Sequence, residues 1–167
     1  MSDQASDTLP LAGVRVLEFC HTIMGPSAGV LLADLGADVI KIEAAPDGDS
    51  TRRMRGFGTG FFYAFNRNKR SIGLDLTKPE GREVLFRLLD EADVLIENYK
   101  TGSMERWGLG YEEVLSKKFP KLVHCRISGF GADGPYGGFP GYDGIIQAMV
   151  GHFSINGAPE GGPTRLG

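Results

Sequence analysis

Short apolar runs alternate along the chain with longer segments in which apolar and polar residues mix. The runs are rich in Val, Ile, Leu and Phe, and a length of about 4–8 residues is typical of buried strands. We expect strands at residues 14–20, 38–43, 71–76, 93–97 and 122–128. The segments between most of these strands are long enough to hold a helix.

The clearest helix is expected at residues 78–92, where apolar residues recur on one face and Pro79 stands in the first turn. Further helices are expected at residues 25–37, 111–119 and 142–150. Strands separated by helices predict parallel βαβ units, so we expect an α/β fold with a Rossmann-like doubly wound parallel sheet. Ligands of such sheets bind beyond the carboxyl ends of the strands, so the loops that follow the strands are the candidate site.

Composition excludes several classes of protein. The 167 residues carry a net charge of -3, so no basic field is present to attract nucleic acid. No apolar run approaches the roughly 20 residues of a membrane span, and the N-terminus lacks the apolar core of a signal peptide. We therefore expect a cytoplasmic protein with no membrane partner. Cys20 and Cys125 lie inside apolar runs and are expected to be reduced thiols of the core.

The two ends of the chain differ from the rest. Residues 1–10 are predicted to be a disordered tail, and residues 11–167 to form the Rossmann-like portion. Residues 154–167 are rich in Gly and Pro. An α/β domain rarely stops in such a run, so a partial polypeptide is favoured over a flexible tail.

Residues 129–134 (GFGADG) match the glycine pattern of dinucleotide-binding folds and follow a predicted strand. That pattern must also open a helix, whose N–H groups bind the pyrophosphate. The residues that follow, Pro135-Tyr136-Gly137-Gly138, argue against a helix, so dinucleotide binding is not favoured. Glu43 stands where a ribose-binding acid would sit, and without the glycine pattern we expect it to be a solvated strand end.

Metal and nucleophile motifs are weaker still. His21, His124 and His152 lack the spacing of metal ligands, so no metal site is predicted and His124 is interpreted as a structural residue of a strand. The chain has no G-x-S-x-G motif, so a hydrolase serine is unsupported.

Two polar clusters stand out. Residues 66–71 (NRNKRS) place three cations just before a strand, where they could form a solvated turn, bind phosphates or a carboxylate, or cross-pair with acids in the core of an assembly. Asn98, Tyr99 and Lys100 follow another strand, with Arg106 close behind. An amide, an aromatic ring and cations together suit a nucleotide or a pantetheine arm.

With these motifs in view, the chain resembles the N-terminal part of a class III CoA-transferase, the group that includes formyl-CoA transferase and carnitine CoA-transferase. The matching stretches appear in family order at residues 11–19, 25–29, 32–43, 66–76, 92–99, 127–131, 134–136, 140–143 and 147–151. The NRNKRS segment followed by a strand is the most specific of them.

The resemblance implies a covalent mechanism. An aspartate attacks the acyl-CoA thioester to form a mixed anhydride, and the thiolate then passes to a new acyl group. Family members are about twice as long as this chain, so the small domain and the returning C-terminal segment would be absent here. Family members also form interlocked homodimers. CoA and acyl-CoA are substrates, and no permanently bound cofactor is implied.

Site residues are carried over from the same resemblance. Ile23 and Met24 match positions that supply backbone groups near the thioester, where they would support the oxyanion. A cation that formyl-CoA transferase uses for the nucleotide is Ala44 here. The positions that match CoA-binding residues, besides Ile23 and Met24, are Leu74, Asp75, Leu76, Thr77, Asn98, Tyr99, Lys100, Arg106, Pro140, Gly141, Tyr142 and Asp143.

The nucleophile is expected shortly after Gly167, because residues 163–167 match the stretch that precedes it in the family. Asp143 matches a different position, within P-G-Y-D. This chain alone is therefore expected to be inactive, whereas the longer polypeptide would transfer CoA from an acyl-CoA thioester to a carboxylic acid. One alternative is an α-methylacyl-CoA racemase, which is expected to carry His where Tyr142 stands. Another is a non-catalytic CoA-binding or scaffold chain.

Overall fold

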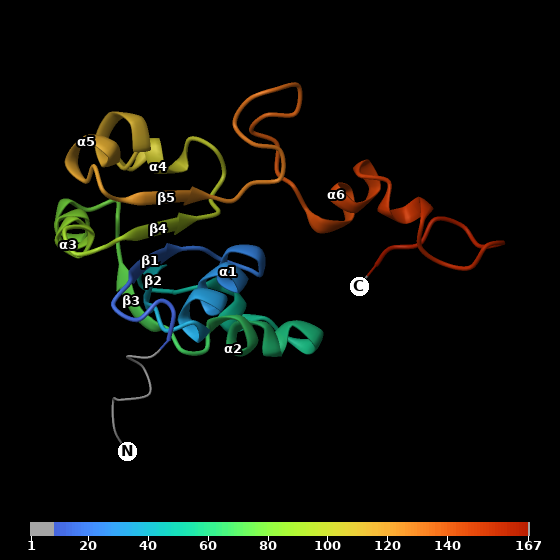
Figure 1. Cartoon of the computed structure of the whole chain (residues 1–167), viewed down its shortest axis with the longest axis horizontal. Helices are drawn as coiled ribbons and strands as arrows, with labels where there is room; N and C mark the ends of the chain where they lie inside the picture. Colours follow the sequence, from blue (N-terminus) through green and yellow to red (C-terminus); the bar gives the residue numbers. More distant parts are fainter. Residues whose placement is uncertain (1–8, 167) are drawn as a thin grey trace, which may run out of the picture. The chain divides into compact units, whose positions relative to one another are not determined.

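The computed structural model describes residues 9–166, except for the side chain of Phe57, and divides into units of residues 1–127 and 128–167 (Figure 1). Residues 1–8 of the predicted disordered tail lie outside the described residues. In the rest of that segment, the carbonyl of Leu9 accepts a hydrogen bond from the N–H of Ala12 at 3.0 Å. The strands are β1 (Arg15–Phe19), β2 (Asp38–Ala44), β3 (Arg70–Leu74), β4 (Val94–Glu97) and β5 (Val123–Arg126).

Helices occupy most of the connections, as predicted. The α-helices are α1 (Met24–Asp34), α2 (Phe61–Asn66), α3 (Pro79–Leu89), α4 (Ser103–Arg106), α5 (Ser116–Lys118) and α6 (Asp143–Met149). Shorter turns of helix are η2 (Ser50–Arg53), η3 (Gly56–Gly60), η4 (Tyr111–Leu115) and η5 (His152–Ser154), of which η4 is a π-helix. None of the helices within residues 9–166 is long and apolar enough to cross a membrane.

All five strands form one parallel sheet in the order β3-β2-β1-β4-β5, which confirms the predicted α/β class. The chain builds outward from β1 to β3, then returns to place β4 on the other side of β1 (Figure 1). Strand order therefore reverses between β1 and β4. In open α/β sheets, this switch point is where a crevice for ligands opens at the carboxyl edge.

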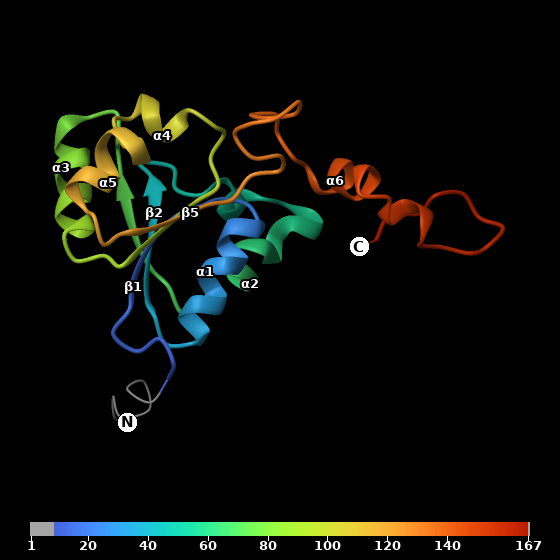
Figure 2. The ribbon, with the colours of Figure 1, turned by 45° about the horizontal axis from the view of Figure 1, so that its top comes forward.

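Apolar side chains cover both faces of the sheet, which explains why the inner strands are nearly continuous apolar runs. One face packs against α3, α4 and η4 through residues such as Leu85, Met104 and Leu115. The other face packs against α1, where Ala33 meets Val16 and Val39. Figure 2 shows α3 and α1 on opposite sides of the sheet.

The edge strand β5 corrects one expectation. Cys20 is a buried thiol as predicted, but Cys125 is exposed. Its neighbour on the same side of the strand, Val123, is 60% exposed. An edge strand has one neighbour only, and α1 packs on the more central strands β1, β2 and β4. The apolar sequence of β5 predicted a buried Cys125, and this was wrong because the face of β5 that carries Val123 and Cys125 is exposed.

Candidate functional site

A cavity of about 190 Å³ opens at the carboxyl edge of the sheet. It is bounded by the ends of β1, β2 and β3 and by the loops that follow β3 and β4. Its lining residues are Phe19, Ile42, Glu43, Ala44, Ala45, Leu74, Asp75, Leu76, Thr77, Tyr99 and Trp107. Five residues singled out from the sequence, Leu74 to Thr77 and Tyr99, therefore lie together, although β3 and β4 are separated by β2 and β1 in the sheet.

The loop after β3 is held in place by its own side chains. Oδ1 of Asp75 accepts hydrogen bonds from the Thr77 N–H at 3.0 Å and from the Thr77 hydroxyl at 2.6 Å. These bonds lower the pKa of Asp75. A side chain at Gly81 would press on the Asp75 carbonyl, since an added Cβ would lie 2.1 Å from it. Only glycine lets α3 pack so close to this loop.

The loop after β1 carries Ile23 and Met24. Ile23 is the N-cap of α1, and Met24 is its first residue. Among the described residues, no side chain caps this end of the helix. The first N–H groups of a helix lack partners within it and favour negative charge. The position is therefore chemically suited to a developing oxyanion.

Asn98 holds this loop from across the switch point. Its Oδ1 accepts from the N–H of His21 at 3.0 Å, and its Nδ2 donates to the His21 carbonyl at 2.9 Å. The amide is thus engaged within the protein. A contact between Asn98 and CoA stays a prediction.

An aromatic group lies beside the same loop. The Tyr99 ring packs edge-on against Trp107 with centroids 4.9 Å apart, and lies 5.4 Å from the ring of His21. Burial raises the pKa of Tyr99 to about 12, so its phenol stays protonated at neutral pH. Sequence reasoning missed Trp107 and the packing role of His21. Their signal was position, since His21 directly follows a strand and Trp107 directly follows Arg106.

The two predicted cations near β4 lie at the surface. Lys100 and Arg106 are both exposed. The Arg106 Nη2 donates to the Ser103 hydroxyl at 2.9 Å, which holds the guanidinium against the start of α4. Both cations are accessible to an anionic ligand, and their contact with CoA stays a prediction.

The remaining predicted residues belong to the unit of residues 128–167. Pro140, Gly141 and Tyr142 lead into α6, and Asp143 is the first residue of that helix. Oδ2 of Asp143 accepts from Gln147 Nε2 at 2.8 Å within that helix, and Tyr142 is 72% exposed. The structure therefore gives Asp143 a local partner one helical turn away.

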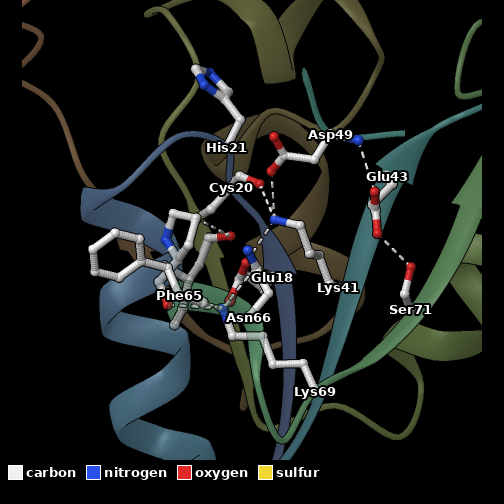
Figure 3. Close-up of polar contacts among 12 residues, drawn as sticks. Glu18, Cys20, His21, Lys41, Glu43, Asp49, Phe65, Asn66, Lys69 and Ser71 are labelled. Carbon is white, nitrogen blue, oxygen red and sulfur yellow. Dashed lines mark hydrogen bonds and ion pairs between the residues drawn. The ribbon is translucent and has the colours of Figure 1, made fainter. Parts of the chain in front are cut away.

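The three cations of residues 66–71 pair with acids of this chain, and Lys69 is the one whose side chain turns inward (Figure 3). The ammonium of Lys69 contacts Oε2 of Glu18 at 2.6 Å, and both side chains are at most 1% exposed. Ser71 donates to Glu43 at 2.5 Å. Arg67 pairs with Asp34 and Arg70 with Asp38. The sequence led us to consider acids in the core of an assembly, whereas the acids observed belong to this same chain. The pair of Lys69 is buried, and Arg67 and Arg70 are exposed, as in a solvated turn.

Glu43 corrects a second expectation, because it is 5% exposed and not a solvated strand end. It accepts from the Asp49 N–H at 2.7 Å and from two nitrogens of Arg52 at 2.7 and 2.6 Å. Burial by itself would raise its pKa, but the bonds from Arg52, Ser71 and Asp49 outweigh burial and lower the pKa to about 2. The ionised carboxylate organises the loop after β2.

The part of the chain that the structure describes shows neither a cluster of metal ligands nor a dinucleotide-binding loop. No group of three or more His, Cys, Asp or Glu side chains within residues 9–166 is placed to hold a metal ion. His124 stacks on Tyr111 with ring centroids 4.9 Å apart, as a structural histidine would, and burial lowers its pKa. The GFGADG segment forms turns in which the Gly131 carbonyl accepts from the Gly138 N–H at 3.1 Å. It opens no helix.

Comparison with known proteins agrees with this geometry. Residues 11–167 match the model of CoA-transferase family III. The chain is 44% identical to the succinate–glutarate CoA-transferase of Agrobacterium fabrum, with 100% of the chain and 44% of that protein covered. It is 42% identical to the acetyl-CoA:oxalate CoA-transferase of Acetobacter aceti, with 95% and 41% covered. The chain thus spans less than half the length of these relatives.

Solved structures agree as well. A CaiB/BaiF family protein from Brucella suis superposes with a TM-score of 0.87 at 44% identity, covering 95% of this chain and 44% of that one. Rv3272 from Mycobacterium tuberculosis superposes with a TM-score of 0.84 at 39% identity, covering 94% and 44%. The match covers nearly the whole chain in both sequence and structure, and the chain therefore belongs to CoA-transferase family III.

Proposed function

We propose that the polypeptide carrying this chain is a CoA-transferase, which moves CoA from an acyl-CoA thioester to a carboxylic acid. The cavity at the carboxyl edge of the sheet is the observation that carries the proposal. Family-matched segments line it, and it lies at the edge where the constrained loop between β1 and α1 begins.

CoA would occupy the groove formed by the loops after β1, β3 and β4. Leu74, Leu76 and Tyr99 supply apolar surface for the ligand. Lys100 and Arg106 supply positive charge for its phosphates. The other residues of the proposed CoA site in this unit are Ile23, Met24, Asp75, Thr77 and Asn98. For the segment Pro140 to Asp143, which belongs to the other unit, the family resemblance alone supports a role in CoA binding.

The chemistry is nucleophilic catalysis by a carboxylate. An aspartate oxygen forms a bond to the thioester carbonyl carbon, the carbon–sulfur bond breaks, and CoA leaves as the thiolate. The acceptor carboxylate then attacks the aspartyl carbonyl of the mixed anhydride, and the donor acid leaves as its carboxylate, so that the aspartate carries the acceptor as a new mixed anhydride. The CoA thiolate attacks the acceptor carbonyl, the carbon–oxygen bond to the aspartate breaks, and the new thioester leaves with the aspartate regenerated. We assign the nucleophile to an aspartate beyond Gly167. N–H groups at Ile23 and Met24 would stabilise the oxyanion.

The relatives guide the choice of substrates. Those named above act, by name, on succinate, glutarate and oxalate. We therefore propose small dicarboxylic acids as acceptors. We also propose that the polypeptide works as a homodimer in the cytoplasm, has a Rossmann-like large domain, and holds no permanent cofactor.

A transfer assay tests the function directly. The full polypeptide and the 167-residue chain are each incubated with succinyl-CoA and glutarate, oxalate or malate. We expect new thioester only from the full polypeptide, and hydroxylamine should trap an acylated aspartate located after Gly167. In the Asp143→Asn variant of the full polypeptide, the trapped aspartate should still be the one after Gly167, even where a loss of CoA binding lowers the amount trapped. Activity of the short chain that Asp143→Asn abolishes would reject this assignment of the nucleophile.

The same preparations separate the alternatives. A racemase would exchange the α-hydrogen of a 2-methylacyl-CoA with deuterium from the solvent, whereas a transferase would not. Tyr142 stands where a racemase is expected to carry the histidine base, and a phenol is a much weaker base than an imidazole. CoA binding without exchange or transfer would identify a non-catalytic CoA-binding chain.

A further inference from the structure

Two buried lysines reach the two ends of the loop that carries Ile23 and Met24. Lys41, on β2, donates to the carbonyl of Cys20 at 2.6 Å, where the loop leaves β1. Lys69, just before β3, donates to the carbonyl of Pro26 at 2.8 Å, in the first turn of α1. Both side chains are only 1% exposed. Figure 3 shows Lys41 and Lys69 pointing toward Glu18. The loop between these carbonyls is thus anchored at each end by an ammonium group.

The charges of this cluster balance. Glu18 lies between the lysines, with Oε1 at 3.1 Å from Lys41 and Oε2 at 2.6 Å from Lys69. Asp49 contacts Lys41 at 3.0 Å. Two cations thus face two carboxylates. Buried ion pairs contribute little net stability compared with apolar packing, so stability alone does not account for the cluster.

The helix α1 is shaped to fit the pair of Glu18 and Lys69. A Cβ added at Gly29 would lie 1.8 Å from Glu18 Oε2 and 3.0 Å from Lys69 Nζ. Any side chain at this position would push the pair out of place. Gly29 therefore lets the first turns of α1 approach the cluster, which brings the Pro26 carbonyl within reach of Lys69.

The loop itself is strained. Thr22 has a φ of +69°, a left-handed conformation that is uncommon for a β-branched residue. Such strain persists only where the surroundings impose it, and it is concentrated at functional sites. The bonds to Cys20, His21 and Pro26 are the restraints that impose it here.

We propose that Lys41 and Lys69 are positioning residues, which fix the backbone N–H groups at Ile23 and Met24 for the thioester carbonyl by holding the carbonyls of Cys20 and Pro26. This inference rests on the proposed function. Oxyanion donors act by being fixed in advance, and a misplacement of about 1 Å can lower a rate about 100-fold. The lysines touch no substrate and act only through the loop.

The test uses the full polypeptide and the double variant Glu18→Gln/Lys69→Gln. This variant removes one buried charge of each sign, so Lys41 keeps Asp49 as its partner while Pro26 loses its ammonium donor. The matched control is Arg67→Gln. It breaks the pair that joins the same basic segment to Asp34 at the far end of α1.

Two measurements are made on each variant. Hydrogen exchange should become about tenfold faster in the peptide covering residues 20–27, which holds the loop after β1 and the start of α1. Exchange in the strands of the sheet should not change to a similar extent. The kcat should fall about tenfold or more, while KM for the acyl-CoA changes by less than about threefold, as expected for an interaction made in the transition state. The control should match the unsubstituted protein in both measurements.

Unchanged exchange in the loop, an unchanged kcat, or equal effects in the control would overturn the inference. If the double variant does not fold, Gly29→Ala displaces the pair without removing a charge, and the same results are expected. Failure of the proposed function is recognised separately, because the unsubstituted protein would then transfer no CoA. Hydrogen exchange would still measure whether the lysines restrain the loop.

Discussion

Asn98 and His21, which are 77 positions apart in the sequence, are joined by two hydrogen bonds between the Asn98 amide and the His21 backbone. The pair spans β4 and the loop after β1, the neighbours between which the strand order reverses. Both the donor and the acceptor of one peptide segment are thereby satisfied by one side chain. The pair closes the switch point of the sheet beside the proposed thioester site.

Replacing Asn98 by Ala should destabilise the protein by about 1–3 kcal/mol, because the N–H and carbonyl of His21 would lose their partner in a half-buried place. Urea unfolding measures this free energy, and kcat should fall with it. Asn156→Ala is the matched control, since that amide makes one bond, to the Thr164 carbonyl at 3.3 Å in the other unit. If the two substitutions lower the free energy of unfolding equally, the two bonds from Asn98 to His21 stabilise the fold no more than the single bond of Asn156.

Acid should weaken the fold through Glu43. Its pKa is about 2 in the folded protein, below the ordinary 4.5, so its contribution to stability is complete above pH 4.5 and is lost as the pH falls from about 4.5 towards 2. The contribution is roughly 2 kcal/mol, reduced because Arg52 is partly exposed to solvent. The Glu43→Gln variant should therefore be less stable than the unsubstituted protein at pH 7. The difference in their free energies of unfolding should be smaller at pH 3.

Urea unfolding at pH 7, 5 and 3 checks the sign of this dependence. Glu80→Gln serves as the control, because Glu80 lies in the exposed first turn of α3. If the difference in free energy of unfolding between Glu43→Gln and the unsubstituted protein stays constant from pH 7 to pH 3, the ionisation of Glu43 does not cause it.

Replacing Arg106 by Ala should weaken CoA binding by about 1–3 kcal/mol, the usual loss for a hydrogen bond to a charged group. Calorimetric titration of the full polypeptide with CoA measures the change. Arg87→Ala is the matched control, an exposed arginine in the last turn of α3. A dissociation constant unchanged by Arg106→Ala would remove this residue from the proposed site.

The two thiols should differ sharply in reactivity. Cys125 is exposed, whereas Cys20 is buried, and burial raises the pKa of its thiol. Because the thiolate is the reactive form, a thiol reagent should label Cys125 in the folded protein and reach Cys20 only on unfolding. Mass spectrometry of the labelled peptides identifies the site. Rapid labelling of Cys20, or protection of Cys125, would contradict this prediction.

The sequence by itself determined the strands, most of the helices and the α/β class. Apolar runs and amphipathic spacing are local signals, and short segments of chain carry them without knowledge of their neighbours. The segments that match the family also stand in the sequence as continuous motifs, so membership was recognisable there. The loops after the strands were predicted as the site for the same reason, because parallel strands present their carboxyl ends at one edge.

The tertiary structure decided how the polar residues are used. Lys69 and Glu43 look like solvated charges in the sequence, and they are buried because strand order brings Glu18, Arg52 and Ser71 against them. Cys125 lies in an apolar run, as Cys20 does, but it is exposed because β5 is an edge strand of the sheet. Partners 9 to 51 positions apart meet only once the sheet has formed, and no local pattern records which of them will be neighbours.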